Sequence, residues 1–236
     1  MKLVIQAVQV TIMMHHEPSV ALPSLDAIVS RIERYLPRAL EGEWRRAAVL
    51  VCVLDKASPT LLFTQRHSGL SSHAGQVAFP GGKKDDRENL EQCALRESYE
   101  ETGLAAENVT VIGRLSEVVS MHGIAVTPFV AVASGACDLS PNPGEVAHIF
   151  DIPLQFLASD PRETTDIMRF SDQPSLFIPR YRYQDYTLWG LSAMITAEFM
   201  RVGLGMNVSL LRAPAFAPTR ELTTISASRY PSDYWT

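Results

Sequence analysis

The sequence predicts an α/β fold in which helices pack on both faces of a mixed β-sheet, an α/β/α sandwich. Three observations lead to this prediction. Short apolar segments bounded by turn residues recur from residue 47 onward. A helical segment at 90–102 interrupts them, and another follows at 188–201. Because each helix must bury an apolar stripe, helices dispersed among strands are typical of layers on either side of a sheet.

Length and composition set the expected domain organisation. The chain has 236 residues, of which 46% are apolar and 20% charged, so it can bury a substantial core. No repeat or low-complexity block divides it. We expect an extension with an amphipathic helix at 1–44, one domain at 45–203 and a tail at 204–236. The tail shows little pattern, so we expect it to lie along the surface or to be partly mobile.

The first expected helix covers residues 25–36, where apolar side chains recur at helical spacing. Ser24, which follows Pro23, is a suitable N-cap. We expect the apolar stripe of this helix to pack against the protein's own core. A contact between two copies in a homodimer is the alternative.

The β-strands are expected where short apolar runs end at turn residues. These runs are residues 47–54, 60–66, 76–80, 109–119 and 125–133. Residues 145–154 are predicted as a strand or a short helix that leads into a loop. The helix at 90–102 should end at Gly103, since glycine readily adopts the conformation that follows many helices.

Charge and cysteine content argue against several classes of protein. Twenty-one basic and 26 acidic residues give a net charge of −5 without a long basic run, so nucleic acid is not an expected partner. No apolar stretch approaches the roughly 18–20 residues that span a bilayer, so no membrane association is expected. The three cysteines are widely spaced, which argues against a disulfide framework or a zinc ribbon. A reducing compartment, the cytoplasm, fits best.

Three carboxylates fall on one face of the helix predicted at 90–102. Glu97, Glu100 and Glu101 stand at positions i, i+3 and i+4, which places them within an arc of about 100°. Such crowding destabilises an isolated helix, and a divalent cation held by oxygen ligands relieves it. The alternative is an acidic helix face that is simply solvated.

Neighbouring residues favour the cation. Glu88 lies one or two turns earlier and could add a carboxylate, while Arg96 could hold one acid through charge-assisted hydrogen bonds. Gly82, in a Pro-Gly-Gly turn, could offer a bare backbone carbonyl to the ion. Oxygen ligands without histidine or cysteine predict Mg²⁺ or Mn²⁺ rather than zinc. An ion of this kind typically binds phosphate.

This segment resembles the Nudix box, G-x5-E-x7-R-E-U-x-E-E-x-G-U, in which U is an apolar residue. The positions that match at the required spacing are Gly82, Glu88, Arg96, Glu97, Glu100, Glu101, Gly103 and Leu104. Ser98 stands where a larger apolar residue is usual, which affects helix packing and not the ligands. The resemblance implies a Nudix fold, hydrolysis of a nucleoside diphosphate linked to another moiety, and metal binding mainly by Glu97 and Glu101.

Residues 61–82 resemble a further signature, that of the coenzyme A diphosphatase branch, approximately LLTxR, six or seven residues, then HxGxVxFPGG. The matching residues are Leu61, Leu62, Thr64, Arg66, His73, Gly75, Val77, Phe79, Pro80, Gly81 and Gly82. His67 replaces the usual Ser or Ala, and Ser71 replaces a usual arginine, whose loss could weaken phosphate recognition. With similar segments downstream, the resemblance covers about residues 47–200.

The resemblance implies a Mg²⁺- or Mn²⁺-dependent hydrolase that converts coenzyme A or its thioesters into 3′,5′-ADP and 4′-phosphopantetheine or its acyl form. Two alternatives remain. One is another Nudix activity, on ADP-ribose or dinucleotides. The other is a catalytically silent Nudix domain that senses a ligand or serves as an interaction module, and the complete set of acids argues against it.

The expected site residues fall into three groups. Substrate contacts are expected from Arg66, His73, Gly75, Phe79 and Gly81, metal ligands from Gly82, Glu97, Glu100 and Glu101, and catalytic roles from Arg96, Glu100 and Glu145. Arg66 could instead form a salt bridge, and His73 could merely cap its turn. Glu145, after a turn-rich loop, could be the general base or could cap the next segment. Glu100 is the other candidate base, although a bound cation would lower its pKa.

Overall fold

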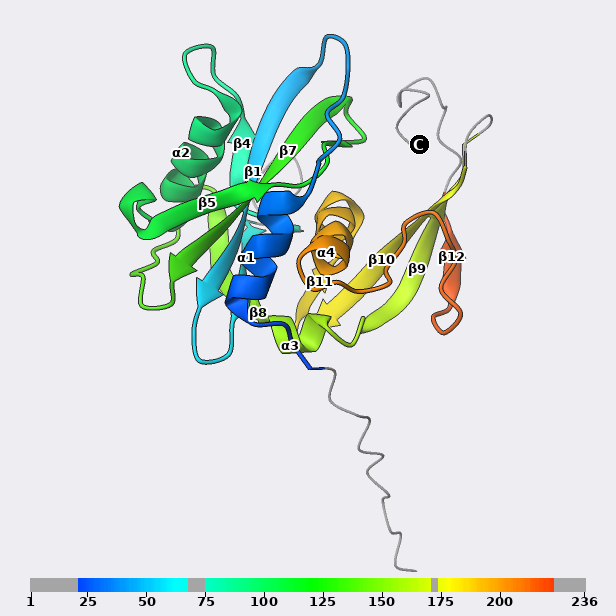
Figure 1. The fold of residues 1–236 in the computed structure, drawn as a ribbon. Helices are drawn as coiled ribbons and strands as arrows, with labels where there is room; N and C mark the ends of the chain where they lie inside the picture. The colour runs from blue at the N-terminus through cyan, green and yellow to red at the C-terminus, as the bar shows by residue number, and fades with distance from the viewer. Residues whose placement is uncertain (1–20, 68–74, 171–173, 223–236) are drawn as a thin grey trace, which may run out of the picture.

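The structure, a computed structural model, describes residues 21–67, 75–170 and 174–222. Within these residues the chain forms a main sheet of eight strands and a second sheet of four. Helix α2 (Leu90–Thr102) packs on one face of the main sheet, and α1 (Leu25–Arg34) and α4 (Gly190–Val202) pack on the other (Figure 1). The predicted arrangement of helices around a mixed sheet is therefore confirmed.

The main sheet combines parallel and antiparallel pairs in the order β3-β2-β1-β7-β5. Its five ordered strands are β1 (Arg45–Asp55), β2 (Thr60–Arg66), β3 (Val77–Ala78), β5 (Val109–Arg114) and β7 (Ile124–Ser134). Strand β1 pairs in parallel with β7 along its whole length and antiparallel with β2. Three further strands pair with β1, β7 and β2 respectively: β4 (Gly81–Lys83), β6 (Val118–Val119) and β8 (Val146–Pro153).

Strand β1 is buried on both of its faces. Leu50 and Cys52 belong to the apolar cluster beneath α2, whereas Val51 and Val53 belong to the cluster beneath α1 and α4. All four side chains are 0% exposed. A strand covered by helices on both sides reads as a continuous apolar run, which explains the unbroken pattern that the sequence shows at 47–54.

Helix α1 packs against the protein's own core, as its apolar stripe predicted. Ile28 and Ile32 are each 1% exposed, and the Ser24 hydroxyl accepts a hydrogen bond from the backbone N–H of Ala27 at 3.2 Å. The helix ends at Arg34, so the prediction that it extends to Leu36 was wrong by two residues. Leu36 is 91% exposed because it lies beyond the last turn and outside the buried stripe.

Helix α2 has the predicted bounds, Leu90–Thr102. It begins with a capping box, in which Asn89 and Gln92 each accept a hydrogen bond from the other's backbone N–H at 2.9 Å. It ends at Gly103, whose φ of 71° lies in the left-handed region. Both ends of the helix that carries the acids are therefore fixed by local interactions.

Several predicted strands differ from those observed. Residues 109–119 form two strands, β5 and β6, because the pairing with β7 shifts register at Gly113 and the chain then leaves the ladder at Leu115 to Glu117. The strand predicted at 76–80 is only Val77–Ala78, and β4 follows it unexpectedly. Of the two alternatives for residues 145–154, the strand is confirmed as β8, and the short helix α3 (Leu154–Leu157) follows it.

The second sheet was not predicted. Its strands, in the order β11-β10-β9-β12, are β9 (Arg162–Met168), β10 (Leu176–Tyr183), β11 (Tyr186–Leu188) and β12 (Thr219–Glu221). Leu188 belongs to β11, so α4 begins at Gly190 and not at the predicted residue 188. Strand β12 comes from the segment expected to be a tail and pairs in parallel with β9.

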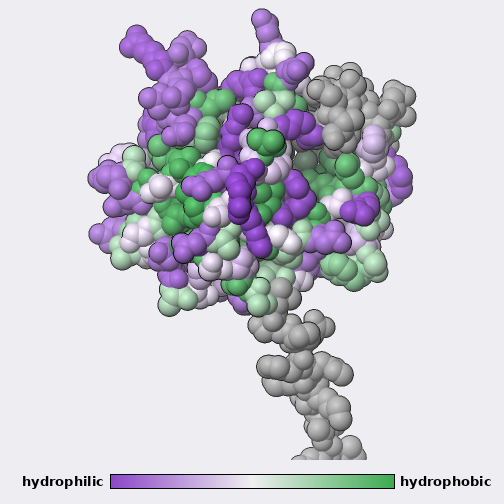
Figure 2. All heavy atoms as spheres, viewed as in Figure 1, coloured by the Kyte–Doolittle hydropathy of each residue, from purple (hydrophilic) through white to green (hydrophobic). Residues whose placement is uncertain are grey.

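The surface carries hydrophilic residues interspersed with smaller hydrophobic areas on the face seen in Figure 2. Large apolar side chains that are exposed include Leu36, Tyr99 and Phe216. In the part of the chain that the structure describes, no helix is long and apolar enough to cross a membrane.

A buried carboxylate attaches the segment after α1 to the main sheet. Glu117 is 1% exposed and accepts hydrogen bonds from the Leu40 backbone N–H at 2.7 Å, the Thr127 hydroxyl at 2.8 Å and the Arg46 guanidinium at 2.7 Å. Burial alone would raise the pKa of Glu117, but these hydrogen bonds outweigh it and lower the pKa. The ionised carboxylate therefore stabilises the fold.

We expect Glu117→Gln to lower the free energy of unfolding near neutral pH by roughly 1–3 kcal/mol, because an amide cannot accept from all three donors. A carboxyl whose pKa is lower in the folded protein than in the unfolded chain stabilises the fold at pH values above its ordinary pKa of 4.5. This stability is lost as the pH falls through the lower pKa of the folded protein. The difference between wild type and variant should therefore shrink from about pH 7 to about pH 4 in urea unfolding. A difference equal at both pH values, or a similar loss in the exposed control Glu43→Gln, would contradict this account.

Candidate active site

The acids on α2 differ in their surroundings, although they share one helix face. Glu101 is 3% exposed, whereas the Glu100 side chain is 53% exposed and that of Glu97 is 18% exposed. The difference arises because β4 and the end of β2 cover the side of α2 on which Glu101 lies. Helical spacing alone predicted the common face but not this gradient of burial.

Two glycines let β4 approach these carboxylates closely. The backbone N–H of Gly81 donates to Glu101 Oε2 at 3.2 Å. At Gly82, a β-carbon would overlap the Glu97 carboxylate, and at Gly81 it would overlap the Ala48 carbonyl on β1. Gly81 also has a φ of 155°, which side-chain-bearing residues rarely adopt. No other residue type at these two positions would keep both β4 and the acids in place.

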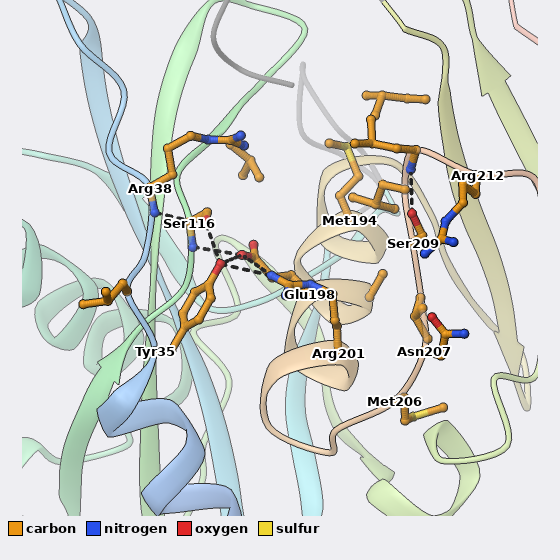
Figure 3. Close-up of a pocket in the computed structure, with 17 residues that line it drawn as sticks. Tyr35, Arg38, Ser116, Met194, Glu198, Arg201, Met206, Asn207, Ser209 and Arg212 are labelled. Carbon is orange, nitrogen blue, oxygen red and sulfur yellow. Dashed lines mark hydrogen bonds and ion pairs between the residues drawn. The ribbon is translucent and has the colours of Figure 1, made fainter. Parts of the chain in front are cut away.

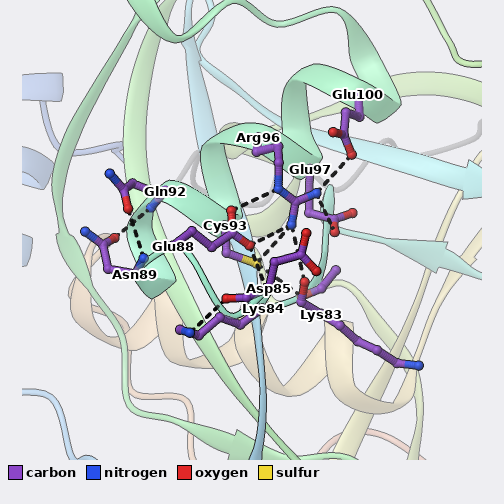
Figure 4. A network of polar contacts seen from close by, with 11 residues as sticks. Lys83, Lys84, Asp85, Glu88, Asn89, Gln92, Cys93, Arg96, Glu97 and Glu100 are labelled. Carbon is purple, nitrogen blue, oxygen red and sulfur yellow. Dashed lines mark hydrogen bonds and ion pairs between the residues drawn. The ribbon is translucent and has the colours of Figure 1, made fainter.

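Arg96 binds three of the acids at once (Figure 4). Its guanidinium donates to both carboxylate oxygens of Glu88 at 2.9 and 2.7 Å, and to Glu97 and Glu100 at 3.0 Å each. The hydrogen bonds from Arg96 lower the pKa of Glu88 to about 2, so Glu88 is fully charged and engaged. Arg96 thus acts as the clamp that the sequence predicted, and it holds more than one acid.

A second arginine approaches the buried acid from β2. Arg66 Nη1 lies 3.5 Å from Glu101 Oε1. Burial raises the pKa of Glu101 to about 7, and the charges of Glu97 and Glu145 add to this effect against the opposing influence of Gly81 and Arg66. Of the two roles considered for Arg66, the salt bridge is therefore present in the structure.

Glu145 lies close enough to this group to influence it. Strand β8 pairs with β2, and the His67 backbone N–H donates to the Glu145 carbonyl at 2.9 Å, which holds residue 145 beside the end of β2. Burial raises the pKa of Glu97, and the nearby charges of Glu100 and Glu145 raise it further. Glu145 itself is exposed. A loop acid that is distant in sequence therefore joins the acids on α2.

The loop before Glu145 is attached to the end of α2. The Asn142 backbone N–H donates to the Glu101 carbonyl at 3.1 Å, and the Ser140 backbone N–H donates to the Thr102 carbonyl at 2.8 Å. These two bonds use helix carbonyls that have no partner within the helix. The sequence gives no signal for them, because they depend on the return of the chain through β7 and β8.

Other predicted site residues occupy varied positions. Gly75 lies beside β2, where its N–H donates to the Arg66 carbonyl at 3.2 Å. Phe79 is 2% exposed and packs its ring 4.5 Å from that of Phe63, so its side chain is part of the core and presents no surface to a substrate. The Gly82 carbonyl accepts from the Cys93 thiol at 3.6 Å. His73 lies outside the described residues, as does Ser71.

Comparison with known proteins identifies the family. The profile of the NUDIX domain matches residues 44–163. The chain belongs to the Nudix family. An uncharacterized Nudix hydrolase NudL from Photorhabdus laumondii is 40% identical to it over 177 residues, which cover 73% of this chain and 94% of that protein. The NudL protein from Pectobacterium atrosepticum is 39% identical over 177 residues, which cover 73% of this chain and 91% of that protein. The crystal structure of the Mycobacterium smegmatis Nudix hydrolase RenU is 28% identical over 49% of this chain and 74% of its own, with a TM-score of 0.41.

This Nudix protein is a hydrolase, and Nudix hydrolases generally use divalent metal ions. Among the described residues, no three acidic, histidine or cysteine side chains already converge into a metal cage. The donor set nevertheless fits a hard cation, because Glu97 and Glu101 are carboxylates whose pKa values are raised by burial and by neighbouring acids. A divalent ion held by these carboxylates would offset the repulsion among the acids.

We expect Gly82→Ala to reduce kcat of this Nudix hydrolase by roughly 10²-fold or more, because the added methyl group must displace the Glu97 carboxylate. The affinity for Mn²⁺, measured by titration calorimetry, should fall as well. The thermal midpoint of unfolding should stay close to that of wild type, since the three nearest atoms all lie at the far end of the Glu97 side chain.

The matched control is Gly144→Ala, in the loop before β8, where a β-carbon would meet no atom closer than 3.4 Å. It should keep kcat within a few-fold of wild type. Wild-type turnover in Gly82→Ala would show that the Glu97 carboxylate need not lie against β4.

Proposed function

We propose that this Nudix hydrolase cleaves the diphosphate of coenzyme A or of its thioesters, giving 3′,5′-ADP and 4′-phosphopantetheine or its acyl form. One observation carries the proposal. Arg66, from the signature that resembles the coenzyme A diphosphatase branch, reaches to 3.5 Å from Glu101, an acid of the Nudix box. The two sequence signatures therefore meet in one site, which supports a common role for them in binding the same diphosphate.

In this proposal Glu97 and Glu101, with Glu100 beside them, would hold Mg²⁺ or Mn²⁺. The ion would neutralise the diphosphate and make a bound water more acidic. The protein's own residues position these acids. Arg96 orients Glu97 and Glu100 through its hydrogen bonds, and the Gly81 N–H orients Glu101. The Gly82 carbonyl accepts from the Cys93 thiol and has a second lone pair, so it remains a candidate ligand beside the carboxylates.

Arg66 is best placed to contact the diphosphate itself. Its guanidinium lies beside Glu101, and its Nε is buried without a hydrogen-bond partner in the described residues. A planar guanidinium with unused donors at an acid cluster is suited to a phosphate oxygen. We therefore assign Arg66 to the diphosphate rather than to the 3′-phosphate of coenzyme A.

The proton acceptor is proposed to be Glu145. Glu100 already accepts a hydrogen bond from Arg96 at 3.0 Å, so one of its carboxylate oxygens is engaged. The Glu145 carboxylate forms no ion pair with another described residue, and it lies near Glu97 and Glu101. It is therefore free to accept a proton from a water that attacks the diphosphate.

We expect coenzyme A to be hydrolysed with a higher kcat/KM than ADP-ribose in Mg²⁺ or Mn²⁺, and no hydrolysis in EDTA. Arg66→Gln should lower kcat/KM for coenzyme A and dephospho-coenzyme A by a similar factor of roughly 10–10³, because both carry the same diphosphate. The products can be separated by chromatography. The control is Arg182→Gln, whose side chain pairs with the exposed Glu163 on the second sheet.

Different outcomes separate the parts of this proposal. Faster hydrolysis of ADP-ribose would retain a Nudix hydrolase but reject coenzyme A as its substrate. A larger loss on coenzyme A than on dephospho-coenzyme A would assign Arg66 to the 3′-phosphate. Turnover of coenzyme A in EDTA, or by Glu97→Gln at the wild-type rate, would exclude the metal-dependent mechanism.

We expect Glu145→Gln to lower kcat by roughly 10²- to 10⁴-fold and to remove the acidic limb of the pH profile, with little change in Mn²⁺ affinity. Glu100→Gln is the matched comparison, because it removes the same charge from the other candidate base. If Glu100→Gln gives this signature while Glu145→Gln turns over normally, proton transfer belongs to α2 and Glu145 has only a structural role.

A further inference from the structure

A groove of about 340 Å³ lies along β8, on the face of the main sheet that α2 covers. Residues 147–151 of β8 line it, together with Leu54 on β1 and Leu62 on β2. Leu139, from the loop between β7 and β8, also contributes to the lining. All three leucines belong to the apolar cluster beneath α2. The groove and the acids of α2 are therefore on the same side of the sheet.

A larger cavity of about 500 Å³ lies on the opposite face of the sheet. It is lined by residues of α4, by the end of α1 and the residues after it, and by the segment 206–212 (Figure 3). None of the acids on α2 lines this cavity. Because the main sheet lies between the two, a molecule held by those acids does not reach the larger cavity.

The groove begins next to the acid cluster. Glu145 directly precedes β8, and Arg66 at the end of β2 pairs with Val146, the first residue of that strand. Ala147, the first residue of β8 that lines the groove, follows at once. From there the strand advances by about 13 Å to Asp151, at about 3.3 Å per residue. A molecule whose diphosphate lies at Arg66 and Glu145 can therefore continue along β8 into the groove.

The loop that contributes to the lining is attached to α2. Leu139 and Pro141, which both line the groove, flank Ser140. The backbone N–H of Ser140 donates to the Thr102 carbonyl at the end of α2 at 2.8 Å. This part of the lining is therefore held in position by the same helix that carries the acids.

The lining is mainly apolar. Leu139, Ala147 and Ile149 are half-buried and leave apolar surface at the groove. Among the described residues that line it, Lys56 and Asp151 bind each other, with Nζ donating to Oδ2 at 2.6 Å. The volume is in the range of small-molecule sites, which are mostly lined by apolar side chains. A groove of this kind suits an uncharged chain that carries aliphatic groups.

We propose that this groove binds the part of the substrate that lies beyond the diphosphate, and that this part is an elongated, uncharged chain with aliphatic groups. The inference rests on the proposed function, because the pantetheine arm of coenzyme A is a chain of that kind. Its aliphatic groups gain free energy when apolar side chains cover them. The terminal ribose of ADP-ribose is short and carries hydroxyl groups, whose burial against apolar side chains is unfavourable. The groove therefore favours coenzyme A over ADP-ribose.

Inhibition of coenzyme A hydrolysis by its two products tests the groove, because each product carries one half of the substrate. 4′-Phosphopantetheine contains the arm, and 3′,5′-ADP does not. Ala147→Leu places a larger side chain in the groove and should raise the inhibition constant of 4′-phosphopantetheine by roughly tenfold or more. The inhibition constant of 3′,5′-ADP should not change. The value of kcat/KM should fall for coenzyme A but not for ADP-ribose.

Two further variants accompany this one. Ala106→Leu makes the same change at an exposed position beyond the end of α2 and should leave both inhibition constants at their wild-type values. Leu139→Gln keeps the approximate size of a lining side chain but makes it polar, so it should also raise the inhibition constant of 4′-phosphopantetheine alone. This second groove variant keeps the test decisive if Ala147→Leu lowers the thermal midpoint of unfolding.

The outcomes separate this inference from the proposed function. If coenzyme A is hydrolysed but Ala147→Leu and Leu139→Gln bind 4′-phosphopantetheine as wild type does, the groove does not hold the arm. An equal rise of both inhibition constants in the two groove variants would also overturn the inference, because it would show a general disturbance of the active site. If the wild-type protein does not hydrolyse coenzyme A, the proposed function is rejected, and this inference with it.

Discussion

The close approach of β4 to α2 is the constraint on which the active site depends. Strand β4 pairs with β1 through Ala48 and Gly82, and at the same time it touches the carboxylates of Glu97 and Glu101. A side chain at residue 81 would overlap β1, and a side chain at residue 82 would overlap the Glu97 carboxylate, so both contacts require glycine. The two glycines therefore transmit the rigid position of the buried strand β1 to the acids. A site built in this way is held by the sheet and not by the loop that precedes it.

The electrostatics of the site follow from the same crowding. Burial raises the pKa values of Glu97 and Glu101, and the charge of Glu145 adds to this effect at both, so the two ionised carboxylates are destabilised as long as no cation is present. Arg96 offsets part of the repulsion and keeps Glu88 ionised. Because a single guanidinium is divided among Glu88, Glu97 and Glu100, it orients the acids without neutralising all of them. The residual negative charge is what a divalent ion would bind.

Sequence reasoning located the elements that local interactions determine. The bounds of α2 and β2 were predicted correctly, because capping residues and apolar runs mark them. Strand β4, three residues with two glycines, has no such signal and exists only through its pairing with β1. Strand β9 was missed because it is rich in polar residues, and β10 was missed because it includes Pro179, which lowers strand propensity. The site shows the same division: the common face of the three acids was predictable, but the burial of Glu101 and of Phe79 depends on long-range packing.

A continuous series of contacts nevertheless connects the two faces of the sheet. Ser116 binds Tyr35 beside the end of α1, and its neighbour Glu117 binds Arg46 on β1. The Arg46 carbonyl accepts from the Lys84 N–H at the end of β4. The carbonyl of Lys83 in turn accepts from Arg96. Contiguity of this kind does not by itself transmit a binding event, because coupling needs an element with two arrangements that each ligand stabilises differently. Glu117, with its three donors and nearly complete burial, favours a single arrangement of this series. The same carboxylate that attaches the segment after α1 to the sheet therefore fixes the middle of this series of contacts.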